Sequence, residues 1–174
     1  MKKVSLKLEP IGKVVERGEV SQVKIFDKYA DGLDHIEKFS HVVVLYWLHK
    51  ISSNLRKTIK IKPLSKGVPT LGIFASRFPA RPNPIGLTTV RLVSRNGCTL
   101  FVSGLDAEKG TPVLDLKPYI PMYDEPKERT VLPEWVKRHI KEHHEHHGEP
   151  HHKHHHYSFE EIMKMVKILQ TVET

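Results

Sequence analysis

The chain has 174 residues, enough to bury a self-sufficient core and suited to one domain with an appendage. Its formal net charge of +8 favours polyanionic partners, and its single cysteine, Cys98, excludes an internal disulfide and a cysteine-based zinc site. The longest apolar run, residues 42–48, is far too short to cross a membrane, and no signal peptide is visible, so we expect a cytoplasmic protein without a membrane partner.

The first two-thirds of the chain predicts β structure. Residues 4–8 alternate apolar and polar side chains, as a half-buried strand does, and residues 11–15 and 20–26 are further candidate strands. Residues 31–39 could hold a short helix. The β-branched and aromatic residues 41–48 predict a central buried strand.

Two further strands, residues 87–93 and 99–103, flank the dipeptide Asn96-Gly97. Asn-Gly is the preferred pair of a type I′ hairpin turn, so we expect that turn here. Residues 113–116 predict one more short strand. Many short strands with frequent Gly and Pro turns predict a mostly β fold, either a barrel or a sandwich.

The C-terminal third differs from the rest. Pro133 suits the first turn of a helix, and residues 158–161 form a capping box for a second helix with one apolar face. That face would pack on the β domain or on a second subunit. A histidine-rich linker, residues 143–156, separates the two helices. We therefore expect a β domain over residues 1–130 and a helical appendage over residues 131–174.

Two segments, residues 77–86 and 110–119, combine charged side chains with prolines. Proline fixes its own φ and keeps the preceding residue out of the α region, so Arg81 and Asn83 are predicted to be held extended. Such a loop loses little conformational entropy when it binds a ligand, and this favours a binding site here.

No Asp or Glu occurs in residues 38–105, although the stretch is rich in Lys and Arg. A one-signed charge bias predicts a positive field that attracts RNA with salt-sensitive affinity. The alternative is a solvated, solubilising face. The RNA contacts that we expect first lie in an apparently irregular segment and are Lys57, Lys60 and Lys62.

The segments 81–86 (Arg-Pro-Asn-Pro-Ile-Gly), 110–119 (Gly-Thr-Pro-Val-Leu-Asp-Leu-Lys-Pro-Tyr) and 40–45, together with Arg77, closely resemble the TsaA-like (TrmO-type) protein family. The matching blocks lie within residues 36–121. The resemblance implies a small β-barrel that binds S-adenosylmethionine without a Rossmann fold. It also implies methylation of N6-threonylcarbamoyladenosine beside the anticodon of tRNA.

The resemblance places the cofactor contacts at three positions: the end of the central strand, the loop arginine, and the turn after the later hairpin strand. Carried over residue by residue, these contacts are His49, Lys50, Arg77, Leu87, Asp106, Ala107, Glu108 and Lys109. Read from the sequence alone, His49 could equally be a packing residue, Arg77 a surface salt-bridge partner and Asp106 an ordinary turn aspartate.

The methyl-accepting nitrogen of the family's substrate carries a proton, so the reaction needs in-line positioning and loss of that proton. Asp115 and Tyr119 project from one face of a predicted strand. Asp115 is the candidate base, Tyr119 a stacking surface or proton relay, and Asn83 the third candidate catalytic residue, with Arg81 on the substrate. Alternatively, Asp115 only pairs with Arg81 and holds the two loops together.

The histidine-rich segment suggests metal binding. On a continued helix, His139, His143 and His147 would share one face at i, i+4 and i+8, a spacing that can chelate Zn²⁺, Ni²⁺ or Cu²⁺. The alternative is a solvated low-complexity linker that binds Ni or Zn only adventitiously.

The chain departs from the family pattern in three places, one of which is that the histidine-rich segment and one helix stand where bacterial members have a larger C-terminal domain. The Arg/Pro/Gln-rich loop between the first barrel strands is shortened to residues 12–19, and Lys109 stands where the family has Asp, a role that Glu108 can take. We predict a homodimeric S-adenosylmethionine-dependent tRNA methyltransferase. The alternatives are a methyltransferase for another RNA or a small molecule, and a non-enzymatic barrel that binds RNA or metal.

Overall fold

The structure is a computed structural model that describes residues 6–147, 162, 164 and 165. It contains two compact units. The first unit joins Met1–Lys50 to Pro84–Tyr119, and the second joins Ile51–Asn83 to Ile120–Thr174. These units divide the chain at other points and do not test the domain boundary expected near residue 130, which stays a prediction.

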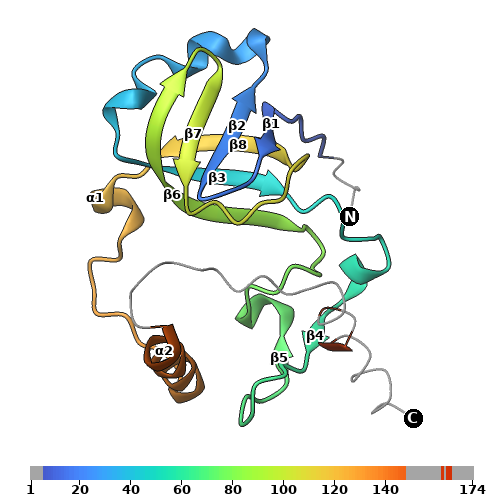
Figure 1. Ribbon diagram of the computed structural model, residues 1–174. Helices are drawn as coiled ribbons and strands as arrows, with labels where there is room; N and C mark the ends of the chain where they lie inside the picture. The colour runs from blue at the N-terminus through green and yellow to red at the C-terminus, as the bar shows by residue number, and fades with distance from the viewer. Residues whose placement is uncertain (1–5, 148–161, 163, 166–174) are drawn as a thin grey trace. The chain divides into compact units, whose positions relative to one another are not determined.

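The first unit is a closed antiparallel barrel with the strand order β1-β2-β7-β6-β3-β8 (Figure 1). The predicted mostly β fold and its barrel are therefore confirmed. Its strands are β1 (Gly12–Glu16), β2 (Val20–Ile25), β3 (His41–Trp47), β6 (Ile85–Asn96), β7 (Thr99–Ser103) and β8 (Pro112–Pro118).

Strand β3 is the central strand that its sequence predicts, because β6 pairs with one of its edges and β8 with the other. Val42, Val44 and Tyr46 alternate into the barrel and are at most 3% exposed. Alternate residues of the other strands fill the same interior, among them Val14, Val23, Leu100, Val102 and Val113. Burial of these apolar side chains is the main stabilising term of the barrel.

The segment before β3 is helical, as predicted, but it forms two 3₁₀ helices, η1 (Asp27–Leu33) and η2 (Ile36–Lys38). His35 separates them with a φ of 66°, a left-handed conformation that ends one helix and redirects the chain into the next. Leu33 and Ile36 are buried in the barrel core, so this segment covers one opening of the barrel interior.

Two expectations about local structure are wrong. Residues 6–8, the described part of the predicted strand at 4–8, are not in a strand, because β1 already pairs with β2 and β8 and the closed barrel offers no free edge. The β6–β7 turn consists of Gly97 and Cys98, since β6 extends through Asn96. Of these two turn residues only Gly97 has a positive φ, 56°, which fits a type II′ turn and excludes type I′.

The second unit carries short elements. They are η3 (Leu55–Lys57), β4 (Lys60–Ile61), β5 (Leu71–Gly72), η4 (Ile73–Ala75), α1 (Pro121–Asp124) and α2 (Glu134–His147). The β4–β5 pair forms a small sheet of its own. The buried apolar side chains of the second unit include Ile51, Leu55, Ile61, Ile73 and Phe78.

Helix α2 begins where Pro133 predicts, and the amides of Val136 and Lys137 donate to the Pro133 carbonyl at 2.9 and 3.2 Å. Of the last predicted helix, residues 162, 164 and 165 are helical, with Ile162 and Met165 buried and Lys164 exposed, as an amphipathic helix requires. The capping box at 158–161 lies outside the described residues. Within the described part of the chain, no helix has the length and apolar character needed to cross a bilayer.

The pairing of β1 with β2 predicts the effect of one substitution. A Cβ on Gly12 would lie 2.4 Å from the Lys24 carbonyl oxygen and 3.0 Å from the Ile25 Cα. Both atoms belong to the backbone, so Gly12→Ala should lower the free energy of unfolding by about 1–3 kcal/mol. In urea unfolding, Gly32→Ala is the matched control, because nothing lies within 4 Å of its added Cβ. Equal midpoints for the two variants would contradict this account of the β1–β2 packing.

Candidate functional site

Asp106 is anchored by two hydroxyl groups of the barrel interior. The Tyr46 hydroxyl donates to Asp106 Oδ1 at 2.6 Å, and the Thr88 hydroxyl donates to the same oxygen. The two hydroxyl oxygens lie 3.1 Å apart, and both side chains are at most 3% exposed. Hydrogen bonds to a charged acceptor are among the stronger ones, so this triangle fixes the turn after β7 against β3 and β6.

Gly86 explains how the Tyr46 ring reaches this position. Gly86 is the register partner of Tyr46, and a Cβ at Gly86 would lie 2.1 Å from Tyr46 Cε2. The ring therefore lies directly over the bare backbone of β6. The glycine that ends the Arg-Pro-Asn-Pro-Ile-Gly motif is required by the packing of an aromatic ring.

Charged side chains gather at the same end of the barrel, after β3 and after β7. Lys50 forms a salt bridge with Glu108, and Lys109 forms one with Glu16 at 3.2 Å. The hydrogen bond from Lys50 holds the pKa of Glu108 below its usual range; the charges of Lys50, Arg17 and His49 add to the lowering, while partial burial opposes it. We call His49, Lys50, Asp106, Glu108 and Lys109 the barrel-end cluster.

Ala107 differs from its neighbours in this turn. Its methyl group is 2% exposed and belongs to the barrel core. Of the residues expected to contact the cofactor, Ala107 can therefore offer only backbone atoms. Its burial between Asp106 and Glu108 fixes the directions in which these two carboxylates leave the chain.

Asp115 and Leu87 lie in one cross-strand row on the outer wall of the barrel, because both pair with Leu45 of β3. Lys117 lies 2.7 Å from Asp115 Oδ2, and the Leu116 amide donates to Asp115 Oδ1 at 2.9 Å. Asp115 raises the pKa of Lys117 by accepting its hydrogen bond and by its charge. The Asp115–Lys117 ion pair shows that residues 115 and 117 share one face of β8.

Tyr119 lies at a different level of the barrel. Its amide donates to the His41 carbonyl at 3.1 Å, and its ring meets the His41 ring edge-on with centroids 6.4 Å apart. His41 and Tyr46 are five residues apart on β3, so Tyr119 lies roughly 17 Å along the barrel from the Tyr46 level. The first unit therefore separates Tyr119 from the barrel-end cluster.

The loop that carries Arg77, Arg81 and Asn83 belongs to the second unit. Ser76 organises it: its hydroxyl donates to the Ile73 carbonyl at 2.9 Å and accepts from the Phe78 amide at 3.3 Å. Its carbonyl accepts from Arg81 Nη1 at 3.4 Å. Phe78 and Ala80 are buried, while Arg77 and Asn83 are exposed. The rigid, extended backbone expected at Arg81 and Asn83 stays a prediction.

The three lysines expected to contact RNA also lie in the second unit. Lys57 and Lys60 are exposed, whereas Lys62 is half-buried and donates to the Val68 carbonyl at 2.9 Å. Lys57 and Lys60 are therefore better placed than Lys62 to bind phosphate.

Helix α2 spans His139, His143 and His147, but their side chains, and all of residues 148–156, lie outside the described residues. Among the side chains that the structure describes, no group of three or more His, Cys, Asp or Glu could hold a metal ion. The metal site at these histidines therefore stays a prediction.

Sequence reasoning missed Tyr46, Thr88 and Gly86 as parts of the site. Tyr46 and Thr88 occupy inward positions of β3 and β6 that are otherwise apolar. A buried hydroxyl needs a partner, so a Tyr and a Thr at core positions are a signal of a buried acceptor nearby. The pairing register that joins them to Asp106 becomes visible only in the folded barrel.

Comparison with known proteins gives a consistent result. Residues 7–125 match the family model described as the tRNA-methyltransferase O N-terminal domain. A probable S-adenosyl-L-methionine-binding protein of Pyrococcus abyssi is 42% identical over 102 residues, which cover 59% of this chain and 53% of that protein. The human tRNA (adenine(37)-N6)-methyltransferase is 41% identical over 104 residues, covering 60% of this chain and 23% of that protein.

Solved structures agree with the fold. The crystal structure of TrmO from Pseudomonas aeruginosa superposes with a TM-score of 0.57 at 26% identity, covering 84% of this chain and 76% of that one. The matched segment thus spans about half of the Pyrococcus protein and about a quarter of the human one.

The contact between Gly86 and Tyr46 predicts a double-mutant result. Gly86→Ala should lower the free energy of unfolding by about 1–3 kcal/mol, because the added methyl group overlaps the Tyr46 ring. Gly86→Ala should cost much less in a Tyr46→Ala background, where the ring is absent. Urea unfolding of the two single variants and the double variant measures this coupling. An additive double variant would show that the ring does not lie against Gly86.

The Lys50–Glu108 pair predicts a pH dependence. The folded-state pKa of Glu108 is lowered, so the stabilisation from this carboxylate is present above its unfolded-state pKa and is lost as pH falls through the folded-state pKa. Carboxyl-carbon NMR titration should show Glu108 titrating below its usual range, and Lys50→Met should move it upward. An unchanged titration in Lys50→Met would exclude Lys50 as the main cause.

Proposed function

Because this chain belongs to the tRNA-methyltransferase O N-terminal domain family, we propose that it is an S-adenosylmethionine-dependent methyltransferase acting on N6 of threonylcarbamoyladenosine beside the tRNA anticodon. The observation that carries the proposal is the barrel-end cluster, in which charged groups gather at the positions where the family resemblance expects cofactor contacts. The names of the archaeal and mammalian relatives support the cofactor and the substrate.

The side chains of the barrel-end cluster suit the polar groups of this methyl donor. Asp106 Oδ1 accepts both hydroxyl groups, which leaves Oδ2 for a ligand donor such as a ribose hydroxyl or an ammonium group. Lys50 and His49 suit a ligand carboxylate, and Glu108 suits an amino group. When bound, the donor supplies an electrophilic methyl group on its sulfonium sulfur.

The residues proposed for the chemistry act by positioning and by proton transfer. Asp115 is the proposed base, and its contacts to Lys117 and to the Leu116 amide fix the orientation of its carboxyl group. A base that is already oriented accepts the substrate proton with less loss of entropy. Tyr119, roughly 17 Å along the barrel from the Tyr46 level, is proposed to stack on a part of the tRNA away from the methyl-accepting base. Arg77 is proposed to bind the cofactor, Arg81 to bind the substrate, and Asn83 to act with Asp115 in the methyl-transfer step.

One observation supports a second candidate acceptor. Strand β1 ends at Glu16 and β2 begins at Val20, so only residues 17–19 connect them. The family resemblance expects a longer Arg/Pro/Gln-rich loop on the substrate side at this point. The short connection therefore favours a wider range of acceptors, such as another RNA or a small molecule.

The oligomeric state and the cellular location expected from the sequence belong to the same proposal. Met122, Tyr123, Val131 and Leu132 expose large apolar side chains after the barrel, which a second copy of the chain could cover, so we propose a homodimer. The free Cys98 is consistent with a cytoplasmic location. Binding of Ni or Zn by the histidine-rich segment is proposed to be separable from methyl transfer.

Methyl transfer from labelled S-adenosylmethionine to tRNA that carries threonylcarbamoyladenosine tests the proposal, with nucleoside mass spectrometry as the readout. Asp115→Asn should lower kcat by about 10²–10⁴-fold, because it removes the proton acceptor, and should leave cofactor affinity within about twofold. Lys117→Gln is the matched control, since it breaks the same ion pair but keeps the carboxylate.

Equal losses of activity in Asp115→Asn and Lys117→Gln would assign Asp115 a structural role. Absence of transfer to this tRNA, with transfer to unmodified RNA or to a small molecule, would favour the second acceptor class. Cofactor binding without transfer to any acceptor would favour the non-enzymatic alternative.

A further inference from the structure

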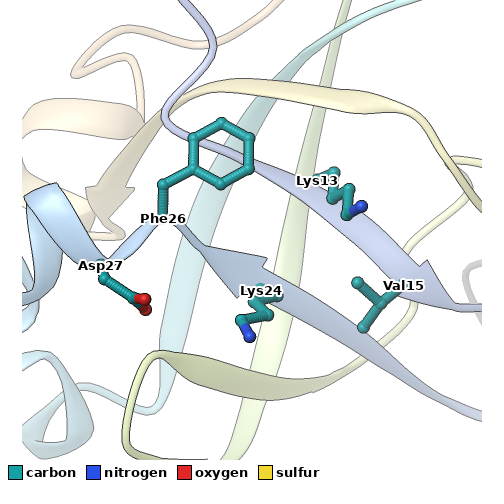
Figure 2. A pocket seen from close by; sticks show the side chains of 5 residues that line it. All are labelled: Lys13, Val15, Lys24, Phe26 and Asp27. Atoms are coloured by element: carbon teal, nitrogen blue, oxygen red, sulfur yellow. The ribbon is translucent and has the colours of Figure 1, made fainter.

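The outer wall of strands β1 and β2 carries a depression that no residue of the proposed methyl-transfer site lines. Its volume is about 480 Å³, and it is widely open to solvent. Figure 2 shows its lining side chains: Lys13 and Val15 from β1, Lys24 from β2, and Phe26 and Asp27 directly after β2.

Two lysines face each other across this depression. Lys13 and Lys24 are register partners on adjacent antiparallel strands, so their side chains leave the same outer face with Cβ atoms roughly 5 Å apart. Like charges directly opposite each other destabilise a sheet. An anion placed between the two ammonium groups would relieve this repulsion.

Among the residues that the structure describes, Lys13 and Lys24 lack the carboxylate partner that five other cations of the barrel unit have. Several neighbouring lysines and one arginine have a carboxylate partner: Lys28 with Glu9, Lys50 with Glu108, Lys109 with Glu16, Lys117 with Asp115 and Arg95 with Glu37. For Lys13 and Lys24, no salt bridge occurs within the part of the chain that the structure describes. Asp27 borders the same depression without closing an ion pair to Lys24.

An exposed aromatic ring stands beside the cations. Phe26 is 36% exposed, although β2 leads directly into it and its amide is fixed by the Ile11 carbonyl at 2.9 Å. Val15 is half-buried and adds apolar surface. Two cations next to an aromatic face are the elements with which proteins bind single-stranded RNA, the cations taking the phosphate and the ring stacking on a base. The Asp27 carboxylate can accept a hydrogen bond from a ribose 2′-hydroxyl.

We propose that this depression binds one nucleotide of an RNA strand, with the phosphate between Lys13 and Lys24 and the base against Phe26. The inference rests on the proposed function in taking tRNA as the RNA. It adds a contact on the β1–β2 wall to those expected from the lysines of the second unit. Because the connection between β1 and β2 is short, this wall supplies RNA contacts that a longer loop would otherwise provide.

The test compares salt-dependent binding of a tRNA transcript by the full chain and its variants. Lys13→Gln/Lys24→Gln should reduce the magnitude of the log K against log salt slope by about 0.7–0.9, which is one phosphate contact, and should weaken binding at 0.1 M salt by about fivefold or more. The control Lys7→Gln/Lys127→Gln removes the same formal charge from exposed positions outside the depression and outside residues 38–105.

Phe26→Leu should weaken binding by about fivefold or more and leave the salt slope unchanged, because it removes stacking and no charge. Thermal unfolding should show that the double lysine variant is at least as stable as the unchanged protein, since the repulsion is relieved. An RNA tetranucleotide should also compete with tRNA for this site better than its DNA counterpart or free adenosine monophosphate.

The proposal is overturned if the double lysine variant binds tRNA with the affinity and slope of the control. It is also overturned if free adenosine monophosphate occupies the site while tRNA binding stays unchanged. Methyl transfer is measured separately on the same variants. If the double lysine variant keeps the salt slope of the unchanged protein and methyl transfer occurs, only this RNA site is excluded. If RNA binds as expected but no methyl group is transferred, the proposed function is excluded and the RNA site is retained.

Discussion

The contact between the Tyr46 ring and the bare backbone of Gly86 is the constraint on which the barrel-end cluster depends. The ring can lie flat against β6 only because Gly86 has no Cβ. This position brings the Tyr46 hydroxyl to Asp106 and fixes the turn that follows β7. That turn then carries Glu108 to Lys50 at the end of β3. A packing requirement in the interior thus determines where charged groups stand at the rim.

The exposed charges of the barrel differ from its core side chains in that pairing with opposite charges, rather than packing, determines their role. Carboxylates pair with Lys28, Lys50, Lys109 and Lys117 at exposed positions, and such pairs add little to stability. Their effect is to decide which cations remain available to a polyanion. Lys13 and Lys24 remain available on the outer wall, and Lys57 and Lys60 remain exposed in the second unit. The positive field of a basic chain is thereby concentrated on a few surfaces.

Period-two alternation and proline placement are local signals, and they predicted a mostly β fold, its central strand and the start of α2. The choice of a barrel over a sandwich came from the family resemblance. Prediction from the sequence failed where the answer depended on pairing. Residues 6–8 alternate like a strand, but the closed barrel has no free edge with which they could pair. The hairpin turn lies one residue later than Asn96-Gly97 predicts, because β6 continues through Asn96. The family motifs located Asp106 and Asp115, yet their partners Tyr46, Thr88 and Lys117 follow from the register of three strands. Motifs therefore identify functional groups, while the sheet determines which of them meet.

Closure of the barrel by β8 has a consequence for how the chain folds. Strand β8 pairs with both β3 and β1, so these pairings join segments that lie far apart in the sequence. Contacts of this kind slow folding, because the entropy of closing a long loop is lost before any pairing stabilises the product. During synthesis, β1 and β3 keep an unpaired edge until residue 118 has left the ribosome. An emerging chain with such edges can join other strands, so chaperone protection matters most in the interval before β8 is complete.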